Sequence, residues 1–304
     1  MNDFILNTKL EDELSWLNGR YLFCSISGGK DSVAMALWLK SQGVLFNPLF
    51  IDTGWEHSAT YEYINNILSP LFGAFTIIKN TKYQNEDQRK DGWNFGFEQM
   101  ILKKKMFPSG AVKFCTHELK LNPLRNFYDE IRPKLKAKPI NAVGLRRQES
   151  FKRSLLDDIQ EQDEATTWRP ILDLNENDVI DLHHKYNVPP NPLYLKGYTR
   201  VGCYPCIYSR KDEIKLLSID DPQRIKQIQH LEERVSKLRD QKKRATFFKS
   251  RRKDKEPQSI VDVVEWSKGK DRDLAHSQQK LEEDGCMRWG LCEPVGMQLE
   301  LFKA

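Results

Sequence analysis

Short apolar runs alternate with longer helical segments through the first half of the chain. The apolar runs predict four strands, at residues 21–26, 45–51, 74–78 and 139–145. The segments between them predict helices at residues 32–40, 58–68 and 118–131, the first of which is apolar nearly all round, as a buried helix is. Strand–helix alternation with short links indicates an α/β fold whose parallel sheet has helices on both faces. Ligands in such folds bind at the carboxyl ends of the strands.

The pattern changes at about residue 220, where a long and highly charged helix is predicted to run from residue 222 to roughly residue 245. Its apolar positions are three and four residues apart, and they form one face made of Ile225, Ile228, Leu231, Val235 and Leu238. A shorter amphipathic helix is predicted at residues 259–266. We therefore expect an α/β domain at residues 1–219 and a helical, basic C-terminal region at residues 220–304.

Composition narrows the class of protein. The chain has 304 residues, of which 39% are hydrophobic and 30% charged, so a packed core is expected. No apolar run approaches the ~20 residues that span a bilayer, and the N-terminus lacks the basic and apolar regions of a secretory signal. We expect a cytoplasmic protein without a membrane segment. Its six cysteines are then reduced thiols, metal ligands or catalytic groups.

Positive charge is concentrated near the C-terminus. The formal net charge is only +5, yet residues 234–255 contain eleven basic and two acidic side chains, so this segment carries +9 and the rest of the chain −4. Phe247 and Phe248 are interleaved with the basic residues, which suits stacking on exposed bases. We expect this segment to contact a polyanionic partner, nucleic acid. A solvated helix face followed by a basic link is the alternative.

Residues 27–32 read Ser-Gly-Gly-Lys-Asp-Ser and join the first predicted strand to the buried helix. The two glycines permit positive φ and close backbone approach, so that successive N–H groups and the helix N-terminus form an anion-binding nest. Ser27 and Ser32 add hydroxyl donors, and Lys30 adds a positive charge. The motif therefore predicts phosphate binding, although its spacing differs from the G-x-x-x-x-G-K-[ST] loop. A turn in which Asp31 or Ser32 caps the helix is the alternative.

The cysteines form a second candidate group. Cys203-x-x-Cys206 has the spacing of metal ligands, and a redox dithiol is the alternative for this pair. Cys24 lies within an apolar run and is predicted to be an inert core thiol. The remaining cysteines are Cys115, Cys286 and Cys292.

Five segments, in order, resemble the PP-loop family of N-type ATP pyrophosphatases, and most closely its branch that includes the phosphoadenosine-phosphosulfate (PAPS) reductases. They are residues 27–32 (SGGKDS), 51–57 (IDTGWEH), 115–124 (CTHELKLNPL), 144–153 (GLRRQESFKR) and 191–206 (NPLYLKGYTRVGCYPC). The resemblance covers about residues 20–215. It implies a Rossmann-like fold of the adenine nucleotide alpha hydrolase type for residues 1–219, followed by the helical C-terminal region.

The resemblance also implies which residues bind ATP and its Mg²⁺. The set expected to hold the β- and γ-phosphates is Ser27, Gly28, Gly29, Lys30, Asp31 and Ser32. Lys30 and Asp31 are the catalytic candidates within it. The residues expected near the adenosine are Asp52, Thr53 and Gly54. The residues expected to face phosphates or an acidic substrate are Arg146, Arg147 and Arg153, for which a surface helix start is the alternative. The histidines predicted to be structural are His57, His183 and His184.

A metal centre is implied on the same grounds. Cluster-containing sulfonucleotide reductases have a Cys-Cys pair before the Lys…Pro-Leu segment and a later Cys-x-x-Cys, and here only Cys115 of that pair is present. We expect a 4Fe–4S cluster, with zinc as the alternative metal. The predicted ligands are Cys115, Cys203, Cys206 and Cys292. Cys286 is the alternative fourth ligand and otherwise the candidate catalytic carrier of a persulfide.

Two departures from the PAPS reductases direct the functional prediction. The SGGKDS loop is complete, whereas theirs is degenerate, and their C-terminal Glu-Cys-Gly-Leu-His motif is absent. An intact loop beside thiolates resembles the sulfur-inserting enzymes. We expect an ATP-dependent sulfurtransferase that adenylates a nucleic acid, tRNA or DNA, releases pyrophosphate and inserts sulfur. The sulfur is expected to be bound to a cluster iron or carried as a persulfide on Cys286, with a sulfur-donor protein as a candidate partner, and the cluster or nearby cations keep it anionic. The alternatives are a sulfonucleotide reductase that releases sulfite, and a non-enzymatic nucleic-acid-binding module with a structural metal.

Overall fold

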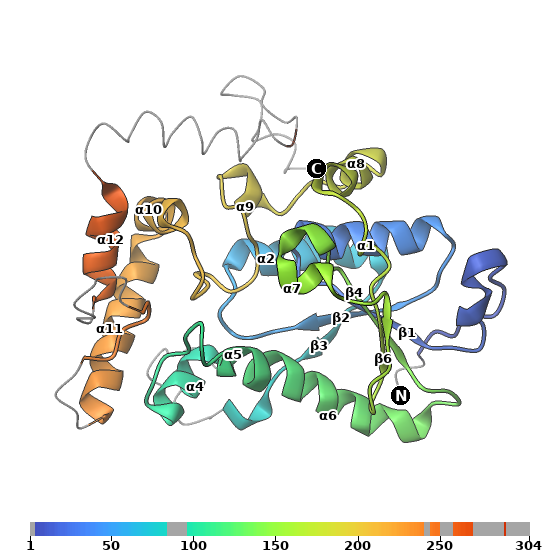
Figure 1. The fold of residues 1–304 in the computed structure, drawn as a ribbon, viewed down its shortest axis with the longest axis horizontal. Coiled ribbons are helices and arrows are strands. Elements are labelled where there is room, and N and C mark those ends of the chain that lie inside the picture. Colours follow the sequence, from blue (N-terminus) through green and yellow to red (C-terminus); the bar gives the residue numbers. More distant parts are fainter. Residues whose placement is uncertain (1–3, 84–95, 240–243, 250–257, 270–288, 290–304) are drawn as a thin grey trace.

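The protein is built around a six-stranded sheet, seen edge-on at the centre of Figure 1, a computed structural model. The model describes residues 4–83, 96–239, 244–249, 258–269 and 289. The strand order is β3-β2-β1-β4-β6-β5, and all neighbours are parallel except β5 and β6. The strands are β1 (Leu22–Ser25), β2 (Asn47–Ile51), β3 (Thr76–Ile78), β4 (Ile140–Val143), β5 (Ile159–Gln160) and β6 (Thr166–Trp168). The predicted α/β fold with a parallel sheet is confirmed.

Helices cover both faces of this sheet, as the sequence predicts (Figure 1). Alternate side chains of β1 explain the two layers, because successive residues of a strand point to opposite faces. Leu22 and Cys24 belong to the core beneath α1 (Lys30–Ser41), α2 (Ser58–Tyr63) and α8 (Glu176–Lys185). Phe23 lies in the opposite core, with Tyr128 of α6 (Asn122–Ile131). Cys24 is fully buried, which agrees with its predicted role as a core thiol.

Two predicted helices are longer or less regular than expected. The helix expected at 58–68 continues as a π-helical turn (Ile64–Leu68) and then as α3 (Ser69–Phe72). The helix expected at 118–131 begins earlier, with α5 (Phe114–Thr116) and a π-helical turn (His117–Leu121) before α6. The sequence reading missed β5, β6, α8 and two further helices, α4 (Phe97–Lys104) and α10 (Lys211–Asp220). The short helices are α7 (Phe151–Ser154), α9 (Pro192–Leu195) and 3₁₀ turns at Asp12–Leu17, Thr81–Tyr83, Arg132–Lys134 and Arg147–Glu149.

Three C-terminal helices stand together at one edge of the fold (Figure 1). Helix α10 packs against α11 (Pro222–Leu238) and α12 (Ile260–Lys268), and α11 also packs against α4. The predicted apolar face of α11 is buried at Ile228, Leu231 and Val235, in a cluster that also contains Trp55 from the loop after β2. The C-terminal helices thus share a core with the α/β part. The boundary between residues 219 and 220 falls within α10, and the division into two domains stays a prediction.

The end of α11 requires a correction. The helix ends at Leu238 rather than near residue 245, and the chain of residues 244–249 folds back on it. Phe247 and Phe248 are 1% and 7% exposed, and Phe247 packs against Trp55 and Phe97. These two rings are part of the core, so they do not stack on exposed bases. Within the described segments of the chain, no helix is long and apolar enough to cross a bilayer.

Candidate functional site

The Ser27–Ser32 segment forms a compact loop between β1 and the N-terminus of α1. Gly28 has a φ of +76°, a conformation that favours glycine, and it lies against Thr60 and Ile64 of the next helix along the chain. The Ser32 hydroxyl donates to the Gly29 carbonyl at 2.8 Å and accepts the Ser27 N–H at 3.1 Å. The loop therefore presents the first turn of a twelve-residue helix, whose dipole favours an anion at this end.

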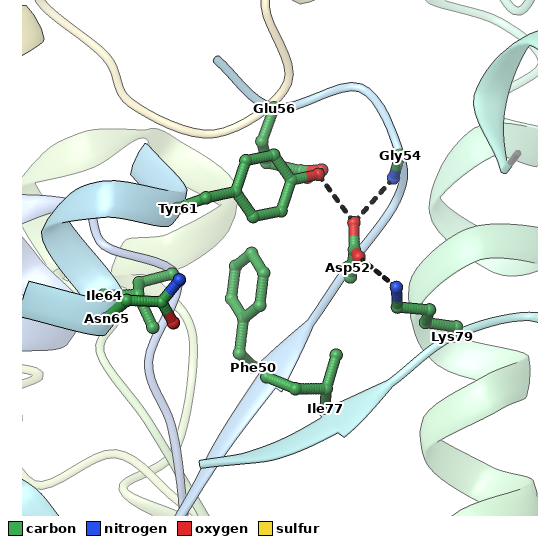
Figure 2. Close-up of a pocket in the computed structure, with 9 residues that line it drawn as sticks. All are labelled: Phe50, Asp52, Gly54, Glu56, Tyr61, Ile64, Asn65, Ile77 and Lys79. Carbon is green, nitrogen blue, oxygen red and sulfur yellow. Dashed lines mark hydrogen bonds and ion pairs between the residues drawn. The ribbon is translucent and has the colours of Figure 1, made fainter. Parts of the chain in front are cut away.

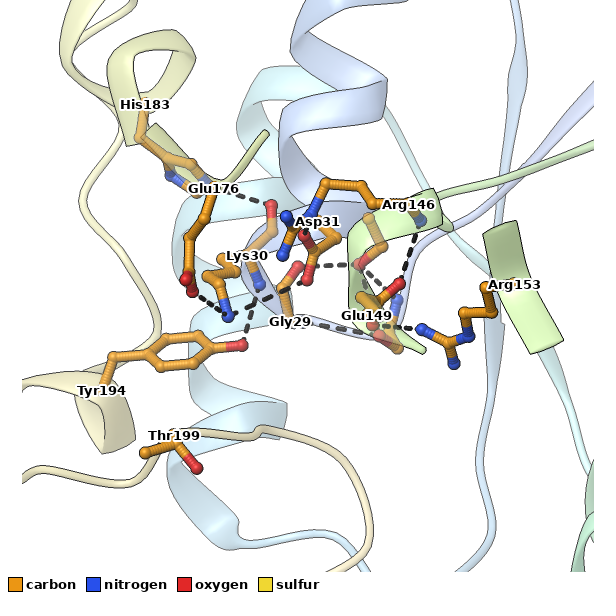
Figure 3. Close-up of polar contacts among 12 residues, drawn as sticks. Gly29, Lys30, Asp31, Arg146, Glu149, Arg153, Glu176, His183, Tyr194 and Thr199 are labelled. Carbon is orange, nitrogen blue, oxygen red and sulfur yellow. Dashed lines mark hydrogen bonds and ion pairs between the residues drawn. The ribbon is translucent and has the colours of Figure 1, made fainter. Parts of the chain in front are cut away.

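Lys30 is held at this helix start by residues from distant parts of the chain (Figure 3). Its backbone N–H donates to the Tyr194 hydroxyl at 3.0 Å, and its ammonium lies 5.2 Å from the centre of the Tyr194 ring. The ammonium also pairs with Glu176 of α8 at 3.2 Å. His183 of α8 approaches the Lys30 carbonyl through Nε2 at 3.1 Å, and burial lowers the pKa of His183. The ammonium also lies 3.9 Å from the Asp31 carboxylate, so an incoming phosphate competes with two carboxylates for this preorganised lysine.

The three predicted arginines occupy three different environments. Arg146 is buried and its guanidinium contacts the Asp31 carboxylate directly (Figure 3). Arg153 pairs with Glu149, whose other oxygen accepts the Arg146 N–H at 2.9 Å. Arg147 instead pairs with carboxylates of a neighbouring loop, Asp158 at 3.1 Å and Asp173 at 2.6 Å. Arg146 therefore lies at the Ser27–Ser32 loop, which we call the phosphate loop. Arg153 is linked to it only through Glu149, and Arg147 is held by ion pairs away from the loop.

A cavity of about 420 Å³ opens beside the phosphate loop, at the carboxyl end of β2 (Figure 2). Asp52 lines it and accepts hydrogen bonds from the Tyr61 hydroxyl at 2.8 Å and the Gly54 N–H at 2.9 Å, while Lys79 pairs with it at 2.9 Å. Ile64, which contacts Gly28, also lines the cavity, so the loop and the cavity adjoin. The volume falls in the range of small-molecule sites.

A buried carboxyl, Glu56, closes one side of this cavity. It accepts hydrogen bonds from the Thr53 hydroxyl at 2.6 Å and from the Trp55 N–H at 3.1 Å, and burial raises its pKa. Of the three residues predicted near an adenosine, Asp52 and Gly54 line the cavity. Thr53 is fully buried, so its side chain supports Glu56 and does not face the cavity.

The Cys203–Cys206 loop is docked on the segment that follows β2. Cys203 pairs with Glu56 in an isolated antiparallel bridge, and the Tyr204 N–H donates to the Trp55 carbonyl at 2.8 Å. The Trp55 indole N–H donates back to the Pro205 carbonyl at 3.1 Å. The thiol loop and the nucleotide-sized cavity therefore share one wall.

Three of the predicted metal ligands gather at this wall. Cys115, Cys203 and Cys206 lie close enough to influence one another's ionisation, and Lys120 lies among them with its pKa raised chiefly by Cys203. Burial raises the pKa of the Cys203 thiol to about 11 and also raises the pKa of the Cys115 thiol. The positive charge of Lys120 lowers both pKa values, but by less. At these two thiols the effect of burial on the pKa outweighs that of Lys120. The expectation that a cluster or nearby cations keep the attacking sulfur anionic concerns Cys286, which lies outside the described residues.

The described residues do not by themselves compose a metal site. Within the described part of the chain, no three or more His, Cys, Asp or Glu side chains are arranged to hold a metal ion. Cys286 and Cys292, the predicted tail ligand and persulfide carrier, lie outside the described residues. The arrangement of Cys115, Cys203 and Cys206 thus does not fit a closed tetrathiolate centre as it stands.

One residue of the tail is described. Trp289 stands between Cys286 and Cys292 in the sequence and is 1% exposed. It packs against His183 and Tyr194, the two side chains that contact Lys30, and its carbonyl lies 2.8 Å from His184 Nε2. The tail thus contacts the wall of the phosphate loop, and the structural roles predicted for His183 and His184 agree with these contacts.

Several residues of the site escaped the sequence reading. Glu176 and Tyr194 reach Lys30 from α8 and α9, and only Tyr194 lies in a segment with a recognisable motif. Arg224 of α11 lies 4.4 Å from the centre of the Trp55 ring and donates to the Glu56 carbonyl at 3.4 Å. Arg224 belongs to a charged helix with no local signal. It joins the C-terminal helices to the cavity wall.

Comparison with known proteins places these features in a family. Residues 21–209, more than half of the chain, match the family model of the phosphoadenosine phosphosulfate reductase domain. An uncharacterized 37.8 kDa protein of Escherichia phage 186 is 29% identical, over 79% of this chain and 82% of its own length. The adenosine 5′-phosphosulfate reductase of Burkholderia cepacia is 28% identical, over 55% of this chain and 61% of its own length. Two uncharacterized proteins of Methanocaldococcus jannaschii match over only 40% and 38% of their length.

Two solved structures share parts of the chain's topology. The PAPS reductase of Candida auris, in a phosphate complex, aligns with a TM-score of 0.45 and 16% identity over 61% of this chain and 82% of its own. The FMN adenylyltransferase of Candida glabrata, in complex with ATP, aligns with a TM-score of 0.41 and 19% identity over 64% of this chain and 57% of its own. With residues 21–209 matched by the family model, the chain belongs to the phosphoadenosine phosphosulfate reductase domain family.

Proposed function

We propose that this protein is an ATP-dependent sulfurtransferase that activates an oxygen of a nucleic-acid acceptor and replaces it with sulfur. One observation carries the proposal. The Ser27–Ser32 loop at the start of α1 adjoins the cavity at the end of β2, and the Cys203–Cys206 loop forms part of the same wall. A phosphate site, a base-sized cavity and thiols are thereby within reach of one bound nucleotide.

The phosphate side suits the pyrophosphate end of ATP. The helix N-terminus and Lys30 supply positive charge for the β- and γ-phosphates, with Mg²⁺ as the companion of the nucleotide. Arg146, fixed by Asp31, adds a second cation at the loop. The adenosine would occupy the cavity between Asp52 and Ile64, which leaves the α-phosphorus exposed between cavity and loop.

The reaction then has two balanced steps. An acceptor oxygen attacks the α-phosphorus in line, the bond to the bridging oxygen breaks, and pyrophosphate leaves. Lys30 and the helix N–H groups stabilise the charge that develops on the leaving group. A sulfur nucleophile then attacks the activated carbon of the acceptor, and AMP leaves with the oxygen. The sulfur comes from a donor protein, which leaves it as a persulfide on Cys286, and the outer sulfur of that persulfide is the nucleophile. After these two steps the sulfur is held as acceptor–S–S–Cys286. A dithiol reductant then cleaves this S–S bond, which releases the thiolated acceptor and the Cys286 thiol while the reductant is oxidised to a disulfide.

The second step requires an ionised sulfur as the nucleophile, and the thiols in the wall of the cavity differ from this requirement. Burial raises the pKa of Cys203 to about 11, so the free thiol is protonated near neutrality and is a weak nucleophile. Cys115, Cys203 and Cys206 therefore suit a structural or metal-binding role better than the role of attacking sulfur. We propose that a tail cysteine, Cys292, completes a 4Fe–4S or zinc centre with them, and no step of the reaction is assigned to that centre.

The competing function is reduction of a sulfonucleotide. The similarity to the adenosine 5′-phosphosulfate reductase of Burkholderia cepacia favours it. Against it stands the complete phosphate loop with a preorganised Lys30, because a sulfonucleotide has no β,γ-pyrophosphate to occupy that loop.

The test is pyrophosphate release from ATP, with single-stranded nucleic acid present as the acceptor, by wild type and by Lys30→Ala. Removal of one preorganised donor to the developing charge is expected to lower the rate about 100- to 1000-fold. Lys185→Ala is the matched control, because Lys185 is an exposed lysine at the end of α8 whose ammonium lies over the ring of the next residue, Tyr186, and we expect it to retain wild-type turnover. Equal turnover of Lys30→Ala and Lys185→Ala, with both folded, would reject the assignment of the loop.

A further inference from the structure

Two segments that contact each other beside the thiols contain basic side chains and no acidic ones. Residues 99–117 contain four lysines and no Asp or Glu, and residues 197–211 contain two arginines, one lysine and no Asp or Glu. They meet where the Tyr208 hydroxyl donates to the Gly110 carbonyl at 3.4 Å. The Lys113 ammonium lies 4.9 Å from the centre of the Tyr208 ring. The contact joins two purely basic segments into one surface.

The exposed members of this surface flank two of the thiols. Lys113 is two residues before Cys115, and Tyr208 is two residues after Cys206, while both cysteines are half-buried. Arg200 lines a cavity of about 20 Å³ together with Cys203 and Cys206. We call Lys113, Arg200, Tyr208 and Arg210 the thiol rim; all four side chains are exposed, Tyr208 by 41%.

The charges of the thiol rim are available to a ligand. Within the described part of the chain, no carboxylate forms an ion pair with Lys113, Arg200 or Arg210. Arg147 and Arg153 near the phosphate loop are, by contrast, each paired with carboxylates. Lys113 at the exposed Tyr208 ring, with Arg200 beside the thiols and Arg210 two residues from Tyr208, favours a polyanion that carries flat, stackable groups.

We propose that the thiol rim is the binding surface for a single-stranded nucleic acid, with an unstacked base against Tyr208 and backbone phosphates on Lys113, Arg200 and Arg210. A single strand is favoured over a duplex because stacking on a side chain requires a base that is free of its neighbours. The surface replaces residues 234–255 as the principal contact, since both aromatic rings of that segment are buried. The identity of the acceptor rests on the proposed function, whereas the binding itself does not.

Binding is measured by fluorescence anisotropy with the full-length protein and labelled single-stranded RNA and DNA of about 16 nucleotides, the upper size of a typical single-strand site. Titrations between about 50 and 200 mM salt give the slope of log affinity against log salt. Lys113→Ala is expected to reduce that slope by about 0.7, the contribution of one phosphate contact on a single strand. Tyr208→Ala is expected to weaken binding about 5- to 150-fold, the effect of one lost stacking contact.

Two control variants separate stacking and local charge from general effects. Tyr208→Phe keeps the ring and should bind like wild type, although it loses the hydrogen bond to Gly110. Lys185→Ala removes a lysine from another exposed cation–aromatic pair, where the ammonium lies 5.4 Å from the Tyr186 ring, and should leave both affinity and slope unchanged. Thermal unfolding of each variant checks that it is folded.

Photocrosslinking with a 4-thiouridine oligonucleotide locates the bound strand independently, and we expect the crosslinked residues to lie within 109–117 or 199–211. The proposal is overturned if wild type binds no single strand at low salt, if Lys113→Ala and Tyr208→Ala match Lys185→Ala, or if crosslinks map to residues 234–239 and 244–249. Tight single-strand binding without pyrophosphate release from ATP would reject the proposed function and leave this inference standing. Pyrophosphate release without oligonucleotide binding would reject this inference and leave the ATP-dependent step of the proposed function standing.

Discussion

Gly144 gives a sharp test of the phosphate loop, because it follows β4 directly and lies against the first turn of α1. A Cβ built at Gly144 would lie 2.7 Å from the Asp31 carbonyl oxygen and 2.8 Å from the Ser32 Cα. These are backbone atoms, so no flexible side chain can swing away. The substitution Gly144→Ala therefore requires the backbone of the phosphate loop to move.

The size of the movement follows from those distances. Ordinary contacts of a Cβ begin at 3.4 Å, so the shortest contact of 2.7 Å demands a displacement of about 0.7 Å. Overpacking of this kind costs typically about 1–3 kcal/mol of unfolding free energy. Misplacement of catalytic groups by about 1 Å lowers rates about 100-fold, so we expect a loss of roughly 10- to 100-fold in pyrophosphate release.

Denaturant unfolding and ATP turnover measure the two effects separately. Gly110→Ala is the matched control, since a Cβ there meets only the Tyr208 ring and hydroxyl, at 3.7 Å or more. It should retain turnover and keep or slightly raise the stability, by about 0.4–1 kcal/mol. If Gly144→Ala has the stability and the ATP turnover of wild type, the Asp31–Ser32 backbone is not the phosphate-binding element that we describe.

Two further predictions concern the C-terminal helices and the thiols. Burial raises the pKa of Glu232 from its usual 4.5 to about 7, so its contribution to folding is present below about pH 4.5 and is lost as the pH rises through 7. Between pH 4.5 and 8, the stability of wild type relative to Glu232→Gln should therefore fall by about 3 kcal/mol in denaturant unfolding, and a difference that does not change with pH would contradict this. Wild type prepared anaerobically should contain iron, and a Cys203→Ser/Cys206→Ser double variant should lose it; full iron content in the double variant, by metal analysis, would reject these ligands.

The turn and helix start at residues 27–32 were predictable because their signal is local, whereas phosphate binding there stays a prediction. Gly28 and Gly29 beside Lys30, after an apolar run, specify a turn, a helix start and a charge within six residues. The parallel sheet was predictable for the same reason, through apolar runs separated by helices. Strands β5 and β6 were not found, because two or three residues carry no usable periodicity.

The partners of the loop could not be read from the sequence. Glu176 and Tyr194 lie about 150 residues from Lys30 along the chain, and only the packing of α8 and α9 brings them to it. The prediction that Phe247 is exposed was wrong for a different reason, because here the local sequence signal was misleading. The basic residues around it indicate an exposed segment, yet the Phe247 ring is buried in the same apolar cluster as Trp55. Long basic side chains can extend from a buried backbone into solvent, so they do not prevent the burial of this ring.

The products formed from the nucleotide test the central claim most directly. In one reaction the protein is incubated with ATP, single-stranded nucleic acid, a persulfide donor and a thiol reductant. In the other it is incubated with each adenylyl sulfate and a thiol reductant, and the products of both reactions are separated and quantified. The account predicts AMP and pyrophosphate in equal amounts from ATP, dependent on Lys30, and no sulfite from either sulfonucleotide. Sulfite release from a sulfonucleotide, together with intact ATP, would contradict the account and identify the protein as a reductase.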